Sequence, residues 1–215
     1  MLKKILILGA GSAGLLAALT LRRRCPALEI QLVRSSEIGV IGVGEGTTMA
    51  FPRFLVSELG LDPVRIYAEA QPTWKLGIRF LWGPRPEFSY TFSRQFNARQ
   101  RDLPRGNGFY CEESVTNLDL WSALMQQDRA LPRRPEGGPD FCNHENLGFH
   151  IENKKLVAFL ERQVSEVGVP IRDGIVREVE RRRDGAVAAV HLESGGRIEA
   201  DFFVDASGFR SEMLG

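Results

Sequence analysis

The sequence predicts an α/β fold that begins with a βαβ unit and later forms a three-strand β-meander. Three observations predict it. An apolar strand runs directly into a glycine-rich turn near the N-terminus, strand and helix patterns then alternate, and an Asp-Gly hairpin signal follows a long segment with a different pattern. Apolar residues make up 43% of the 215, which is enough for a substantial core.

The βαβ unit occupies the start of the chain. Residues 2–8 form an apolar strand, and residues 13–24 carry apolar side chains at helical spacing. Residues 29–33 form a second strand, which we expect to lie parallel to the first because a helix connects them.

The turn between the first strand and the helix fits the dinucleotide pattern G-x-G-x-x-G at Gly9, Gly11 and Gly14. Gly9 permits the tight turn, Gly11 lets a pyrophosphate approach the backbone, and Gly14 allows close helix–sheet packing. Ser12 and Ala13 begin the helix, whose free N–H groups attract an anion. The turn therefore predicts a nucleotide cofactor.

The middle of the chain departs from a plain nucleotide-binding domain. Residues 49–59 read as a helix, and residues 72–82 alternate strictly as one strand, with Trp74 on one face and Lys75 on the other. Residues 121–129 read as a short helix. We interpret residues 72–147 as an excursion toward the substrate side of the protein.

The chain then returns to regular structure. Asn153 is positioned to cap a helix that runs to about Val167. Two strands flank Asp184-Gly185, a third follows Gly195-Gly196, and together they form the meander. Residues 201–205 read as a buried strand that ends at Asp205.

This order of elements is typical of two-dinucleotide-binding-domain flavoproteins, which bind FAD in an extended form on a Rossmann-like domain. We therefore predict one incomplete FAD-binding domain over residues 1–215. The alternative is an unrelated α/β protein with an inserted hairpin.

Composition excludes several other classes of protein. The net charge is +1, from 28 basic and 27 acidic residues, so we expect neither a nucleic-acid partner nor a membrane partner. Three cysteines and three histidines show no metal-ligand or disulfide spacing. The N-terminus lacks a signal-peptide pattern, and we expect a cytoplasmic protein.

Three positions invite a chemical interpretation. Arg34 stands where an acid commonly binds the cofactor ribose, so it either indicates NADP, flanks the adenosine of FAD, or reaches solvent. The cluster Gly42-Val43-Gly44-Glu45-Gly46 lets backbone approach a planar ring or a diphosphate, although surface loops also collect glycine. Lys75 is an acid or nucleophile if its face lines a cavity, and an ordinary solvated lysine otherwise.

Four segments occur in one order: GAGSAG at 9–14, IGVGEGT at 41–47, WKLGIRF at 74–80 and FFVDASGFR at 202–210. The set resembles the flavin-dependent tryptophan halogenase family. The resemblance covers most of the chain but less than half of a family member, because the chain ends at Gly215 and contains no Trp-x-Trp-x-Ile-Pro motif.

The resemblance implies an FAD-dependent oxidoreductase in which reduced flavin, oxygen and halide give hypohalous acid. Lys75 matches the lysine that directs this oxidant onto an aromatic substrate, and a separate flavin reductase supplies the reduced FAD. The implied cofactor contacts are Gly9, Gly11, Ser12, Ala13, Gly14, Arg34, Gly42, Val43, Glu45, Gly46, Val176 and Asp205.

Other functions remain open at this point. The chain could belong to a flavin monooxygenase that uses no halide, or it could be a truncated FAD-binding fragment without catalysis. An NADP-dependent dehydrogenase rests on Arg34 alone.

Overall fold

A computed structural model describes residues 2–39, 43–82, 87–92, 120–138 and 147–213. Contacts divide the chain into two compact units. The first contains Met1–Val43, Glu58–Gln71 and Glu152–Gly215, and the second contains Gly44–Ser57 and Pro72–Ile151. The single FAD-binding domain with an excursion over residues 72–147 stays a prediction.

The first unit is built on a parallel sheet. Its strands are β12 (Phe202–Asp205), β1 (Lys4–Leu8), β2 (Glu29–Arg34) and β8 (Ile171–Asp173), in that order. Every neighbouring pair is parallel. Helix α1 (Ser12–Arg24) connects β1 to β2, which confirms the predicted βαβ unit.

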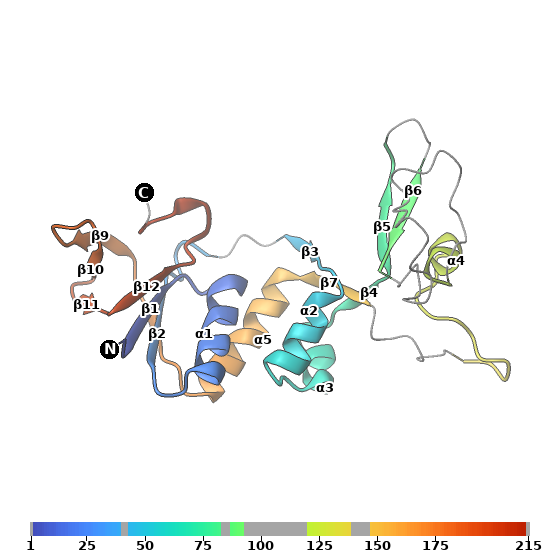
Figure 1. Cartoon of the computed structure of the whole chain (residues 1–215), viewed down its shortest axis with the longest axis horizontal. Coiled ribbons are helices and arrows are strands. Elements are labelled where there is room, and N and C mark those ends of the chain that lie inside the picture. The colour runs from blue at the N-terminus through green and yellow to red at the C-terminus, as the bar shows by residue number, and fades with distance from the viewer. Residues whose placement is uncertain (1, 40–42, 83–86, 93–119, 139–146, 214–215) are drawn as a thin grey trace, which may run out of the picture. The chain divides into compact units, whose positions relative to one another are not determined.

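Helices and a second sheet cover the two faces of this parallel sheet. Helices α1 and α5 (Asn153–Glu166) lie side by side on one face (Figure 1). The meander of β9 (Val176–Arg181), β10 (Val187–Leu192) and β11 (Arg197–Glu199) supplies the other layer. One buried cluster joins the two sheets: Leu6, Leu8, Val33, Val190, Leu192, Ile198, Ala200 and Met213.

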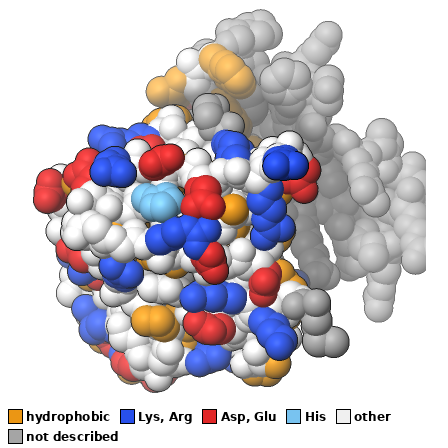
Figure 2. Space-filling view, turned by 90° about the vertical axis from the view of Figure 1, so that its left-hand side faces the viewer, with side chains coloured by type: hydrophobic (Ala, Val, Ile, Leu, Met, Phe, Trp, Pro, Cys, Tyr) orange, Lys and Arg blue, Asp and Glu red, His pale blue; other side chains and the backbone are white. Residues whose placement is uncertain are grey.

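The predicted hairpin is confirmed. Strands β9 and β10 pair antiparallel around the turn at Gly185, whose φ of 85° favours glycine. The outer face of the meander carries charges of both signs, and Figure 2 shows this side of the molecule. There, Glu180 accepts hydrogen bonds from Arg197 and contacts His191 Nε2 at 3.0 Å.

Two predictions in this unit are wrong in detail. The strand ending at Asp205 is not buried, because β12 lies at the edge of the described sheet and Phe202 is 54% exposed. Asn153 does not cap α5. Glu152 occupies the N-cap position without a side-chain hydrogen bond, and Asn153 is the first helical residue and is buried.

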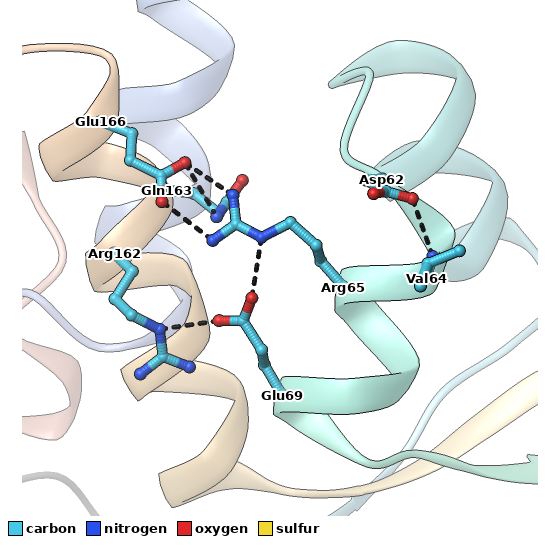
Figure 3. Close-up of polar contacts among 7 residues, drawn as sticks. All are labelled: Asp62, Val64, Arg65, Glu69, Arg162, Gln163 and Glu166. Atoms are coloured by element: carbon cyan, nitrogen blue, oxygen red, sulfur yellow. Dashed lines mark hydrogen bonds and ion pairs between the residues drawn. The ribbon is translucent and has the colours of Figure 1, made fainter.

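A short helical segment is tied to α5 by charged side chains. Asp62 caps helix α3 (Pro63–Arg65), because its side chain accepts a hydrogen bond from Val64 N, and the helix continues as a π-helical turn to Ala70. Arg65 donates two hydrogen bonds to Glu166 and one to Glu69, and Arg162 also donates to Glu69 (Figure 3). Arg65 therefore lowers the pKa of both carboxyl groups.

The second unit contains two small sheets and helix α4 (Leu120–Gln126). The first sheet has the order β3 (Gly44–Gly46), β7 (Gly148–Glu152) and β4 (Thr73–Lys75). The second pairs β5 (Gly77–Phe80) with β6 (Phe88–Thr91). The same unit holds helix α2 (Ala50–Arg53), followed by a π-helical turn.

The prediction of one continuous strand over residues 72–82 is wrong. The chain forms β4 and β5, which pair with different strands and are separated by Leu76. Leu76 is buried with Trp121, Leu124 and Leu147, so it anchors this break in a small core. Apolar and polar residues alternate in the same way whether the segment forms one long strand or two consecutive strands that run in the same direction.

Candidate functional site

The glycine turn after β1 is shaped both for packing and for an approaching ligand. A β-carbon on Gly9 would collide with the Ala206 carbonyl, and one on Gly14 would collide with the Gly9 carbonyl. Gly9 also has a φ of 105°. Gly11 differs, because no heavy atom lies within 4 Å of the position that its β-carbon would occupy. The open space at this turn therefore lies at Gly11.

Helix α1 presents its N-terminus at this open point. Gly11 is the N-cap residue and makes no side-chain capping bond, and Ser12 and Ala13 are the next two residues. The first N–H groups of a helix have no partner within it, and together with the helix dipole they favour an anion. Gly9, Gly11, Ser12, Ala13 and Gly14 thus fit the pyrophosphate of a dinucleotide.

Arg34 ends β2 and pairs with Glu161 of α5, so its charge is already balanced. The neighbouring strand β8 adds Asp173, which accepts a hydrogen bond from Ser36 N at 3.0 Å. This interaction with Ser36 lowers the pKa of Asp173, and the charge of Arg34 contributes further. Arg34 therefore has a carboxylate partner and is not simply a solvated side chain at the end of the strand.

Asp205 shapes the segment that follows β12. One carboxylate oxygen accepts hydrogen bonds from the backbone N–H and the hydroxyl of Ser207, and the other accepts from Met213 N at 2.7 Å. Ala206, the next residue, donates to the Leu8 carbonyl beside the glycine turn. Asp205 therefore holds in place the backbone that packs against Gly9.

The remaining predicted cofactor contacts are scattered. Val176 starts β9, and its side chain packs against the core of the first unit. Gly42 lies outside the described residues, and Val43 is 58% exposed. Glu45 and Gly46 belong to β3 in the second unit. The structure brings Gly9–Gly14 together with Asp205, and it brings Gly46 together with Lys75.

Lys75 lies at the end of β4, opposite Gly148 of β7. The Thr47 carbonyl and the Phe92 ring occupy the position of a β-carbon on Gly148, and the lysine side chain reaches Gly46 of β3. Its Nζ lies 3.0 Å from the position of a β-carbon on Gly46, and 5.6 Å from the centroid of the Phe92 ring, a cation–π distance. No carboxylate pairs with this ammonium among the residues that the structure describes.

Sequence reasoning missed His150, Glu161 and Ala206. His150 lies beside Lys75 at Gly46, and the pairing of β4 with β7 that brings them together was not predicted.

Among the described residues, no group of His, Cys, Asp and Glu side chains could hold a metal ion. Within that same part of the chain, no helix is long and apolar enough to cross a membrane.

The fold and the glycine turn define a Rossmann-like α/β protein with a dinucleotide-binding turn. Residues 4–215 match the model of the tryptophan halogenase family, and the chain belongs to this family. The family and the fold predicted from the sequence are therefore confirmed.

Named relatives and solved structures support this assignment. The chain is 26% identical to tryptophan 7-halogenase KtzQ of Kutzneria sp. (strain 744), and the match covers 100% of this chain and 44% of KtzQ. It is 26% identical to tryptophan 7-halogenase RebH of Lentzea aerocolonigenes, over 98% of this chain and 43% of RebH. The chain thus spans less than half the length of these relatives.

Two solved structures extend the comparison. MibH, a tryptophan 5-halogenase, is 34% identical with a TM-score of 0.83, and the match covers 99% of this chain and 41% of MibH. Xcc4156, a flavin-dependent halogenase from Xanthomonas campestris, is 30% identical with a TM-score of 0.75, over 98% of this chain and 43% of that one.

Proposed function

We propose that this chain forms the FAD-binding and lysine-bearing part of a flavin-dependent halogenase that acts on an aromatic compound. One observation carries the proposal. In a chain of the tryptophan halogenase family, Lys75 places an ammonium group without a described carboxylate partner beside Gly46 and the Phe92 ring. A structural lysine would more commonly be paired or fully solvated.

The cofactor fits the first unit. The space at Gly11 and the free N–H groups of Ser12 and Ala13 suit the pyrophosphate of FAD. Arg34, Val43, Glu45, Gly46, Val176 and Asp205 remain proposed cofactor contacts, as does Gly42. When bound in its reduced form, FAD supplies the electrons for the oxygen chemistry that converts halide to hypohalous acid.

Lys75 then acts on the oxidant. Its Nζ–H donates a hydrogen bond to the oxygen of hypohalous acid, which withdraws electron density and makes the halogen more electrophilic. The Phe92 ring and the backbone of Gly46 restrict where the ammonium can lie. The partners are thus an aromatic substrate, a halide ion and a separate flavin reductase, and we propose a cytoplasmic location.

The experiment uses the complete protein that contains this chain, with FAD, oxygen, a flavin reductase and an electron-rich indole. Mass spectrometry should detect a brominated product with bromide and none without it. A hydroxylated product that forms without halide would instead indicate a flavin monooxygenase. FAD binding without any product would indicate a fragment that lacks catalysis.

A further inference from the structure

Lys75 and His150 lie on one face of the sheet β3-β7-β4. Thr73 pairs with His150, and Lys75 pairs with Gly148, across antiparallel β4 and β7. Side chains two residues apart on a strand point to the same face, so Lys75 and His150 are diagonal neighbours on it. A β-carbon on Gly148, between them on β7, would lie 2.7 Å from the Thr47 carbonyl oxygen and 2.9 Å from Phe92 Cε2, so only glycine fits there.

Gly46 of β3 fixes how close the two groups are. The position of a β-carbon on Gly46 lies 3.0 Å from Lys75 Nζ and 3.6 Å from His150 Nδ1. The separation of the two nitrogens therefore cannot exceed the sum of these distances. Lysine carries its ammonium on a flexible four-carbon stem, so rotation about this stem can move Nζ toward the imidazole ring.

No other described titratable group competes for this position. Glu45 is adjacent to Gly46 on β3, and strand alternation directs it to the opposite face. Glu152, farther along β7, pairs with Lys155 of α5 at 3.5 Å. His150 is exposed, so its ring can exchange protons with water.

We propose that His150 is a positioning residue that returns a proton to Lys75 after each halogen transfer. This inference rests on the proposed function. When the O–X bond of hypohalous acid breaks, the halogen bonds to a ring carbon, and the oxygen takes a proton from Lys75 Nζ and leaves as water. The ring then loses its proton to solvent. Protonated His150 gives a proton to the neutral amine and is reprotonated from solvent, so atoms and charge balance.

The test compares His150→Asn and His150→Ala in the complete protein. Asparagine preserves the size and hydrogen bonding of the Nδ1 side but cannot carry a proton at neutral pH. Both variants should lower kcat by about tenfold or more and lower KM in the same proportion, because the proton returns to Lys75 only after halogen transfer and kcat/KM therefore stays unchanged. The matched control is His191→Asn, in the meander of the other unit.

A rescue experiment separates proton transfer from a structural role. Because the position is exposed, phosphate buffer should reach it in His150→Ala and raise kcat as its concentration increases at constant ionic strength. FAD binding and thermal unfolding should match the unmodified protein. Full activity of His150→Asn, or a loss in His150→Ala that phosphate does not relieve, would overturn the inference.

The outcomes also separate this inference from the proposed function. If Lys75→Ala still halogenates, the proposed function fails whatever His150 does. If Lys75→Ala is inactive and His150→Asn is fully active, only the role of His150 fails.

Discussion

Lys75 and Gly46 approach each other across β7, and the lysine Nζ lies 3.0 Å from the point that a β-carbon on Gly46 would occupy. The two residues come from strands that are separate in the sequence and are joined only through β7. Gly46, in the glycine cluster at residues 42–46, therefore leaves space for the Lys75 ammonium.

Replacing Gly46 with alanine should move the Lys75 ammonium without unfolding the protein. The new methyl group meets the end of a flexible side chain, which can shift at little cost. We expect the rate of halogenation to fall at least about tenfold, equivalent to ~1.4 kcal/mol of activation free energy. Single-turnover assays with preformed reduced FAD measure this effect.

Gly44→Ala is the matched control, because no heavy atom lies within 4 Å of its β-carbon position. Equal losses of activity in the two variants would show that the cluster acts through loop flexibility, and that its contact with Lys75 has no effect.

The glycines of the first turn should separate folding from cofactor binding. A methyl group on Gly14 meets the rigid backbone of Gly9, so Gly14→Ala should lower the free energy of unfolding by about 1–3 kcal/mol. A methyl group on Gly11 has no heavy atom within 4 Å, so Gly11→Ala should leave the free energy of unfolding unchanged. It should raise the Kd for FAD by about tenfold or more, because it takes up the space of the pyrophosphate. Urea unfolding and fluorescence titration with FAD measure the two effects. A Gly11→Ala protein that binds FAD normally would contradict the assignment of the pyrophosphate to this point.

Much of the first unit could be predicted from local sequence signals. The apolar run of β1, the glycine turn and the Asp-Gly hairpin each depend on neighbouring residues, and all three occur as expected. The exposure of Phe202 could not be predicted in this way. An apolar residue gives no indication of whether its strand lies inside a sheet or at the edge.

Candidate site residues could be named from the sequence, but the contacts between them could not. The strand pattern singles out Lys75 and the family resemblance gives it a role, whereas its position beside His150 depends on the pairing of β4 with β7. The sequence leaves Arg34 open between a nucleotide contact and a solvated side chain, whereas in the structure Glu161, 127 residues later, pairs with it. Such contacts join segments far apart in the chain, and no local pattern encodes them.

The charged face of the meander predicts a pH dependence. The hydrogen bonds from Arg197, and then His191, lower the pKa of Glu180 from 4.5 to about 2. A lowered pKa in the folded state stabilises the fold above pH 4.5, and this contribution is lost as the pH falls toward 2. Glu180→Gln should therefore be less stable than the unmodified protein at pH 7, and the difference should shrink across this window.

Urea unfolding at several pH values checks this expectation, with Glu193→Gln, in the turn that follows β10, as the control. A stability difference for Glu180→Gln that stays constant from pH 7 to the acid end of the window would show that the carboxylate charge does not contribute.

The central claim is that Lys75 directs halogenation, and the product yield of Lys75→Ala in the complete protein tests it most directly. The variant should bind FAD with unchanged affinity and consume oxygen, but form no halogenated product above the level produced by free hypohalous acid. Halogenation by Lys75→Ala at the rate of the unmodified protein would contradict the account.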